Sequence, residues 1–229
     1  MEPTPEKVKL RPYDSSRRQR NADAARARIV TVARTRFLSD GYTPTTIAAI
    51  ARGADVSVDT IFKAYGGKPG LLRAIYSQSL AGGEPVTAET RSDALQTTET
   101  DPHRIMLGLG RLTAEVAPLV APLMLLIRDA ALADPEMSTL KTDLDQQRLD
   151  RMTHNARNLA AAGHLRSDIT IEHAAEIMWT YSAPELFELL VIQRGWTAEH
   201  LGDFVADALT THLLHPARSR RTAGHRQAP

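Results

Sequence analysis

Near the N-terminus, apolar residues recur at the spacing of an α-helix and are separated by residues that end one helix and begin the next. Ile29, Ala33 and Phe37 lie four residues apart and predict the inner face of a first helix, which ends near Gly41. Pro44 has no backbone N–H group and cannot continue that helix. The pattern therefore predicts that the chain changes direction after the first helix.

Two shorter helices follow this break and are joined by a tight turn. Thr45 is a good cap for the first of them, whose core-facing residues are Ile47, Ile50 and Ala51. Ser57 caps the second. A short helix, a turn and a second short helix form a helix-turn-helix, the arrangement that sets one helix into the DNA major groove.

The rest of the chain also has helical periodicity, and no segment alternates convincingly as a strand does. Pro69 opens a fourth short helix, and Pro118, Pro122 and Thr197 mark boundaries between longer ones. The longer helices are expected at 101–117, 119–133, 136–162, 170–193 and 197–214. The predicted fold class is all-α, with an N-terminal three-helix helix-turn-helix domain and a larger C-terminal helical domain.

Composition along the chain predicts five segments. The N-terminal residues mix proline, serine and arginine without periodicity, and the stretch before residue 100 is rich in Gly, Thr, Ser and Glu. The expected segments are a flexible basic arm (1–21), a helix-turn-helix DNA-binding domain (22–80), a linker (81–100), a larger helical domain (101–215) and a disordered tail (216–229).

The formal net charge of +1 conceals two oppositely charged regions. Residues 16–78 contain eleven lysines and arginines against four aspartates, whereas residues 79–215 contain ten basic and twenty acidic side chains. A basic head attracts DNA phosphates and an acidic body is repelled by them, which orients the protein as it associates. The alternative is that both regions are ordinary solvated faces. Arg17, Arg18 and Arg20 either reach into a minor groove or act by non-specific attraction.

Length and composition exclude several classes of protein. The 229 residues can build one large or two small domains with a substantial core. No apolar run approaches the roughly 18 residues of a membrane helix and no signal peptide is recognisable, so a cytoplasmic location is expected. The chain has no cysteine, and its eight histidines form no pair at metal-binding spacing. We expect no metal, no cofactor and no catalytic residue, and the protein is predicted not to be an enzyme.

Hydroxyl side chains of the predicted helix-turn-helix are candidates for contacts with DNA. Thr46 and the amide groups at the start of the second helix can bind phosphate at the positive end of the helix dipole. Ser57 and Thr60 either face the groove or only cap and fill the structure.

Charged and apolar residues of the third helix are candidates for contacts with the edges of DNA bases. Lys63 can read guanine or hold a phosphate, and Val58 can meet a thymine methyl group. Asp59 either is placed near the helix start because the dipole favours it there, or accepts a hydrogen bond from a cytosine amino group.

The segment from Ala22 to Tyr76 resembles the DNA-binding domain of the TetR family of bacterial transcriptional repressors. The resemblance is carried by Ile29, Ala33, Phe37, Gly41-Tyr42, Thr45-Thr46, Ile50-Ala51, Val56-Ser57, Thr60-Ile61-Phe62, Lys68 and Leu71-Leu72. It covers about a quarter of the chain, and the rest is similar to the family mainly in its layout. The resemblance implies a homodimer that binds a palindromic operator in double-stranded DNA and is released when a small molecule enters the C-terminal domain.

The resemblance also implies which positions contact DNA. Lys68 matches a contact to the DNA backbone, and Phe62 matches a position where tyrosine often touches phosphate, although phenylalanine offers only an apolar contact. Asp59 and Ala64 depart from the family, which often has glycine and an aromatic residue or histidine at these positions. The expected DNA-binding residues are Thr45, Thr46, Ser57, Val58, Asp59, Thr60, Phe62, Lys63 and Lys68.

A ligand pocket is implied by the resemblance, and a dimer interface is expected on the apolar faces of the last two helices. The expected ligand-binding residues are Leu112, Leu123, Met124, Ile127, Met152, Met178, Trp179 and Tyr181. Methionine and aromatic stripes of this kind are also typical of plain core. The expected dimer-interface residues are Leu186, Phe187, Leu190, Val191, Phe204, Ala208, Leu209 and Leu213.

Three functions are therefore compared. The first is a transcriptional repressor that responds to a small molecule, and the second is an architectural or partner-recruiting DNA-binding protein without small-molecule induction. The third is an all-helical enzyme with an incidental helix-turn-helix. An apolar pocket with a few polar groups favours the first, a filled core favours the second, and a cleft with clustered titratable residues favours the third.

Overall fold

The computed structural model describes residues 15–81 and 86–215, with side chains from residue 19 onward. In these ranges every regular element is a helix, apart from one isolated antiparallel bridge between Leu165 and Leu214. The predicted all-α architecture is confirmed. The chain divides into two compact units between Leu71 and Leu72, rather than near residue 80 as expected.

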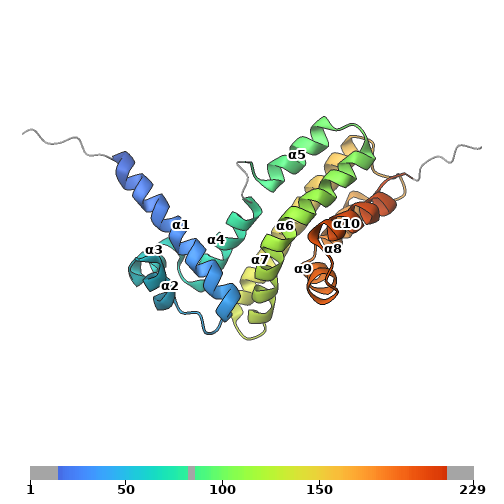
Figure 1. Ribbon diagram of the computed structural model, residues 1–229. Coiled ribbons are helices and arrows are strands. Elements are labelled where there is room, and N and C mark those ends of the chain that lie inside the picture. The colour runs from blue at the N-terminus through green and yellow to red at the C-terminus, as the bar shows by residue number, and fades with distance from the viewer. Residues whose placement is uncertain (1–14, 82–85, 216–229) are drawn as a thin grey trace, which may run out of the picture. The chain divides into compact units, whose positions relative to one another are not determined.

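The first unit holds the predicted helix-turn-helix. Its helices are α1 (Ser15–Asp40), α2 (Ile47–Ala54), α3 (Val58–Tyr65) and the start of α4 (Lys68–Ala81) (Figure 1). The N-cap of α2 is Thr46, one residue later than expected, and its hydroxyl oxygen accepts a hydrogen bond from the N–H group of Ala49 at 3.1 Å. Asp55 ends α2 in the left-handed conformation, with φ at 54°, and so turns the chain toward α3.

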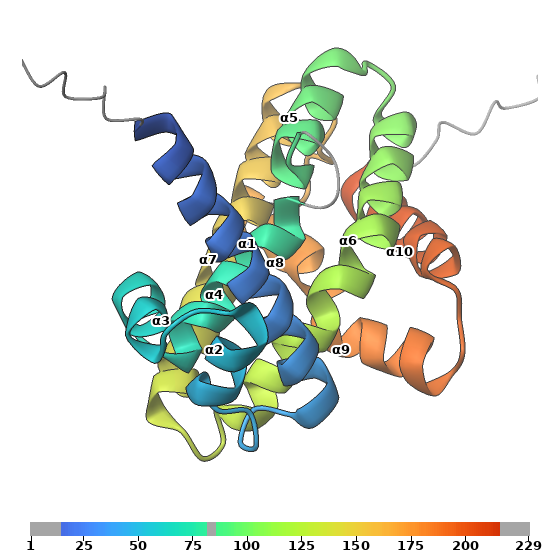
Figure 2. The same cartoon turned by 60° about the vertical axis from the view of Figure 1, so that its left-hand side comes forward.

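The core of the first unit includes most of the apolar residues that the spacing predicted, although Ile47 is only partly buried. The buried residues include Ile29, Val30, Ala33, Phe37, Ile50, Ala51 and Ile61. Figure 2 shows α2 against α1, with α3 leading away from α2 after the turn. Burial of one face of each helix leaves the opposite face of α3 in solvent.

The second unit is a bundle around two long helices. Its helices are the rest of α4, α5 (Ala88–Thr98), α6 (Pro102–Ala130), α7 (Pro135–Ala161), α8 (Ile171–Tyr181), α9 (Pro184–Phe187), the π-helix η1 (Glu188–Gln193) and α10 (Ala198–Leu213). Helices α6 and α7 lie side by side, α10 packs along α6, and α8 packs along α7 (Figure 1). Their inner faces form one apolar core that includes Ile105, Met106, Leu159, Met178 and Leu201.

Two expected segments without regular structure are helical. Helix α1 begins at Ser15, so the part of the basic arm from 15 to 21 is helix, while residues 1–14 lie outside the described residues, as does the tail 216–229. Helix α5 lies within the expected linker 81–100. Thr87 caps α5 by accepting a hydrogen bond from the N–H group of Thr90 at 3.2 Å, and this capping signal was missed.

Two expected helix boundaries were also wrong. The segments 101–117 and 119–133 form the single helix α6, which continues through both Pro118 and Pro122. Proline removes a backbone donor but does not have to end a helix whose packing holds it together. The expected helix 170–193 is divided into α8, α9 and η1.

The expectation that no segment is long and apolar enough to be a membrane helix was wrong for α6. This helix is the one in the described ranges that is long and apolar enough, by length and composition alone, to cross a membrane. The core helix of a soluble bundle passes the same test. In this structure α6 contacts α5, α7, α9 and α10, and the side chains of Ile105, Leu123 and Ile127 are fully buried.

Candidate DNA-contacting face and small-molecule pocket

One face of α3 is exposed to solvent. Ile61 is the only buried residue of α3, whereas Val58 and Phe62 are 40% and 49% exposed despite being apolar. Val58 and Phe62 are four residues apart, so they lie on the same side of the helix. Of the expected DNA-binding residues, Ser57 and Thr60 are exposed as well.

The charged residues of α3 are paired with each other. The Lys63 ammonium nitrogen lies 2.7 Å from a carboxylate oxygen of Asp59, one helical turn earlier. Both side chains are strongly exposed, at 77% and 69%. An exposed pair of this kind contributes little to the stability of the fold, typically about 0.3–0.5 kcal/mol. A gain in stability therefore does not explain why the pair is present on this face.

Ser57 and Thr60 have a structural role in addition to their exposure. The Ser57 hydroxyl oxygen accepts a hydrogen bond from the Thr60 N–H group at 3.1 Å, which caps α3. The two hydroxyl groups are also 2.8 Å apart and hydrogen-bonded. The cap therefore fixes both hydroxyl groups at the start of α3.

The expectation that Thr45 contacts DNA was wrong. Its side chain is 2% exposed, and its hydroxyl group donates to the carbonyl oxygens of Gly41 at 2.7 Å and Arg36 at 3.2 Å. A buried hydroxyl needs such partners because an unpaired one costs free energy. Thr45 thus holds the loop between α1 and α2 against the end of α1. Its neighbour Thr46 is the exposed residue at the start of α2.

Lys68 is half-buried at the start of α4. Its ammonium group donates to the carbonyl oxygen of Tyr42 at 2.8 Å and lies 4.1 Å from the centre of the Tyr42 ring. These contacts fasten the start of α4 to the loop after α1. An ammonium group has three donors, so the expected phosphate contact stays a prediction.

The second unit contains a cavity of about 640 Å³. One wall, from α6, α9 and α10, is apolar and includes Leu112, Val116, Met124, Phe187 and Val205. The facing wall, from α4, α5 and α7, carries the polar side chains of Tyr76, Ser92, Arg148, Arg151 and Asn155. Burial raises the pKa of the Tyr76 hydroxyl, while the nearby Arg148 lowers it.

Most of the expected ligand-binding residues line this cavity. Those that do are Leu112, Met124, Met152, Met178 and Tyr181. Leu123 and Ile127 do not, because both are fully buried on another side of α6. Trp179 also lies outside the lining: its indole N–H donates to the carbonyl oxygen of Asp145 at 3.3 Å.

Arg148 connects Trp179 with the cavity wall. Its guanidinium carbon lies 4.3 Å from the centre of the Trp179 ring, and one of its terminal nitrogens donates to the Trp179 carbonyl oxygen at 2.6 Å. The other terminal nitrogen donates to Asp145 at 3.2 Å. Asp145 also accepts from Lys141 at 2.7 Å, so this one carboxylate is shared by two cations.

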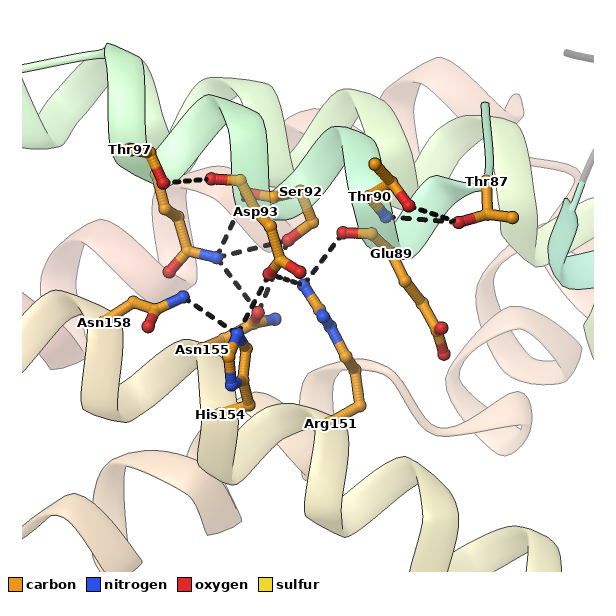
Figure 3. A network of polar contacts seen from close by, with 11 residues as sticks. Thr87, Glu89, Thr90, Ser92, Asp93, Thr97, Arg151, His154, Asn155 and Asn158 are labelled. Atoms are coloured by element: carbon orange, nitrogen blue, oxygen red, sulfur yellow. Dashed lines mark hydrogen bonds and ion pairs between the residues drawn. The ribbon is translucent and has the colours of Figure 1, made fainter. Parts of the chain in front are cut away.

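A polar network joins α5 to α7 beside the cavity (Figure 3). Asp93 of α5 accepts hydrogen bonds from Arg151 at 2.6 Å and shares one with His154 at 3.1 Å. The hydrogen bond from Arg151 is the main reason that the pKa of Asp93 is lowered. Behind this pair the buried Gln96 amide donates to the side-chain oxygen of Asn155 at 3.0 Å. This network could not be predicted from the sequence, because its members are distant along the chain.

The expected dimer-interface residues divide into buried and exposed ones. Phe187, Leu209 and Leu213 are 7%, 4% and 0% exposed and belong to the core of their own chain, which disfavours the expected role in a dimer interface. Leu186, Leu190, Val191 and Ala208 are partly exposed, and Phe204 is 36% exposed. Leu189 and Ile192 of η1 were not among the expected residues and are 52% and 58% exposed. Both belong to the π-helical segment η1, in which no residue is buried.

The histidines of the described ranges are possible metal ligands by their chemistry. No group of three or more histidine, aspartate and glutamate side chains in residues 15–81 and 86–215 is arranged to hold a metal ion. His154 contacts Asp93, and His200 stacks on Trp196 at 3.8 Å between ring centres. Both histidines thus have structural partners.

The sequence of the first unit matches a known family. Residues 29–75 match the model for bacterial regulatory proteins of the tetR family. None of the curated proteins compared matches the chain. The match spans α2 and α3 completely, together with parts of α1 and α4.

Several solved structures share the fold over most of the chain. A transcriptional regulator from Saccharomonospora viridis in complex with choline has a TM-score of 0.62 and 19% identity, covering 85% of this chain and all 100% of that one. A TetR-family regulator from Syntrophomonas wolfei has a TM-score of 0.68 and 17% identity, covering 82% and 94%. The fatty acid degradation regulator FadR from Bacillus halodurans has a TM-score of 0.65 and 14% identity, covering 81% and 94%. The TM-scores show a shared fold.

Proposed function

Because residues 29–75 form the N-terminal domain of the TetR family of bacterial regulators, we propose that this protein is a transcriptional repressor. In this proposal a homodimer binds a palindromic operator in double-stranded DNA and leaves it when a small molecule enters the C-terminal unit. Regulators of this family are generally DNA-binding proteins without enzymatic activity, and we place this one in the cytoplasm.

The exposed face of α3 is the observation that carries the DNA-binding proposal. An eight-residue helix with a single buried residue, two exposed apolar residues and an exposed ion pair fits a major groove, which an α-helix can enter. The start of α2 adds the exposed Thr46 and the positive end of a helix dipole, which favours phosphate.

The cavity of the second unit supports small-molecule control. Its volume of about 640 Å³ and its mostly apolar wall are typical of sites for small organic ligands. The similar regulator from Saccharomonospora viridis is a complex with choline, a small molecule. The open cavity disfavours the alternative of an architectural or partner-recruiting protein, for which a filled core was expected.

Helix α4 offers a route by which the ligand and DNA affect each other. It starts in the first unit at Lys68, and its later residues Tyr76 and Leu80 line the cavity of the second unit. A ligand that moves these residues moves a helix that is covalently continuous with the DNA-contacting unit. The two binding events are then coupled reciprocally, typically by about 1–3 kcal/mol.

Selection from a pool of random duplex DNA tests the proposal. The protein should enrich one sequence with two-fold symmetry, and Phe62→Ala should weaken binding to that duplex at least about tenfold. Leu38→Ala is the matched control, because Leu38 of α1 is also an exposed apolar residue, at 39%, and should leave affinity unchanged. Enrichment of no sequence would reject the DNA-binding proposal.

A further inference from the structure

The Asp59–Lys63 pair places one acceptor and one donor side by side on the exposed face of α3. Their facing atoms are 2.7 Å apart, and neither side chain is covered by other parts of the first unit. In the major groove, a G·C base pair presents guanine O6, an acceptor, next to cytosine N4, a donor. These two base atoms are hydrogen-bonded to each other and lie about 2.9 Å apart, as in an ordinary N–H···O bond.

We propose that Asp59 and Lys63 act together as one reading unit for a single G·C base pair in each half of the operator. Lys63 donates to guanine O6, and Asp59 accepts from the N4 amino group of the paired cytosine. The ion pair stays intact in this arrangement. Lys63 donates both to guanine O6 and to Asp59, and the cytosine N4 amino group donates both to guanine O6 and to Asp59, so the four groups form a closed cycle of hydrogen bonds. The inference rests on the proposed DNA-binding function and specifies the sequence that α3 recognises.

The atoms beside the contacted donor and acceptor determine whether the two side chains prefer a G·C or an A·T base pair. Beside O6, guanine presents a second acceptor, N7, which a lysine ammonium also favours. An A·T pair likewise presents adjacent donor and acceptor atoms, adenine N6 and thymine O4. There, however, the Asp59 carboxylate meets the acceptor N7 of adenine, and Lys63 meets the thymine methyl group. Repulsion between the Asp59 carboxylate and adenine N7, together with the loss of the second acceptor that guanine N7 offers to Lys63, therefore disfavours A·T at this position.

The pair also predicts the effect of one isosteric change. Asparagine can donate to adenine N7 and accept from adenine N6 at the same time. Asp59→Asn changes only a carboxylate into an amide and breaks the charge pairing with Lys63. It should therefore move the preference at one position of each half-site from G·C to A·T.

The experiment uses the full chain and a random duplex pool, followed by paired duplexes that differ only at the identified position. The unchanged protein should prefer G·C there by about tenfold or more, within the range expected for one good base contact. Asp59→Asn should reverse the preference, and Lys63→Ala should abolish it. Asp23→Asn is the control, because Asp23 forms an exposed pair with Arg26 in the same unit, at 3.5 Å, and should leave every base preference unchanged.

Three results separate the possibilities. A changed preference at a single position supports the reading unit. A uniform gain in affinity for all duplexes with Asp59→Asn, without altered base preference, overturns it and reduces Asp59 to a negative charge near phosphate. If the unchanged protein enriches no sequence at all, the proposed DNA-binding function fails and the reading unit fails with it.

Discussion

Gly110 of α6 and Gly202 of α10 face each other so closely that neither position has room for a side chain. A Cβ atom on Gly110 would lie 2.4 Å from the carbonyl oxygen of Gly202, and one on Gly202 would lie 2.5 Å from that of Gly110. The contact joins α6 and α10, two of the three helices that form the apolar wall of the cavity.

Gly110→Ala should therefore destabilise the protein, by about 1–3 kcal/mol or more, because the obstructing atom is backbone and cannot rotate away. Gly108→Ala is the matched control on the same helix, since its Cβ would meet the flexible end of the Leu95 side chain at 2.4 Å. Thermal unfolding should show the larger loss for Gly110→Ala. Equal losses for the two variants would contradict the close approach.

The proposed homodimer can be tested at the exposed apolar residues of η1. Replacing both Leu189 and Ile192 with glutamate should produce monomers without loss of folding, because two charges would be buried between the chains. Light scattering measures the mass, and circular dichroism checks the fold. Leu132→Glu, at a position 88% exposed after α6, is the control that should stay dimeric. An unchanged dimer in the double variant would place the interface elsewhere.

Filling the cavity should prevent ligand uptake while leaving the fold intact. Leu112→Trp adds volume toward the space of about 640 Å³, so the protein should enhance the fluorescence of the apolar dye ANS less than the unchanged chain does. Leu107→Trp is the control, because Leu107 lies on the same helix, is 46% exposed and does not line the cavity. Equal dye binding by both variants would argue against the cavity as the binding site.

Asp93 should make the stability of the fold depend on pH in the acidic range. Its pKa is lowered, chiefly by the hydrogen bond from Arg151 and with a contribution from His154, so its stabilising effect is present above the unfolded pKa of about 3.9. The effect is lost as the pH falls through the lower, folded pKa. Asp93→Asn should thus lower the unfolding midpoint at pH 7, and the difference should shrink below about pH 4. Asp203→Asn, at an exposed position of α10, is the control. A deficit independent of pH would exclude the ion pair as its cause.

Lys68 should influence both DNA binding and stability. Lys68→Ala removes the contacts to Tyr42, so the unfolding temperature should fall, consistent with a loss of about 1–2 kcal/mol. If Lys68 also holds a phosphate, the slope of log affinity against log salt should decrease by about one for every DNA sequence. An unchanged slope would make Lys68 a purely structural residue.

The sequence predicted the first unit well because its signals are local. The spacing of Ile29, Ala33 and Phe37 and the cap at Ser57 depend on neighbours within one or two helical turns, and residues 29–75 were recognisable as a family motif. Thr45 was misassigned because a threonine before a helix has the same sequence signal whether it is exposed or closes a turn.

The second unit was predicted only in outline because its details depend on packing between distant helices. Leu209 and Ile192 are both apolar and lie in adjacent elements, yet one is 4% and the other 58% exposed. Apolar periodicity identifies an inner face but does not say whether it meets its own chain or another one. Trp179 lies outside the cavity for the same reason: its orientation depends on Arg148, which belongs to another helix.

The two prolines within α6 have a mechanical consequence for the cavity. Proline has no N–H group to donate, so the carbonyl oxygens of Ala114 and Pro118 receive no hydrogen bond from the residue one turn ahead, which is Pro118 or Pro122. Bending a helix is easiest where its hydrogen-bond ladder is interrupted. Val116, Val120 and Ala121 line the cavity in this same stretch. The wall is therefore compliant, and we expect it to fit molecules of different length by flexing rather than by rearranging its side chains.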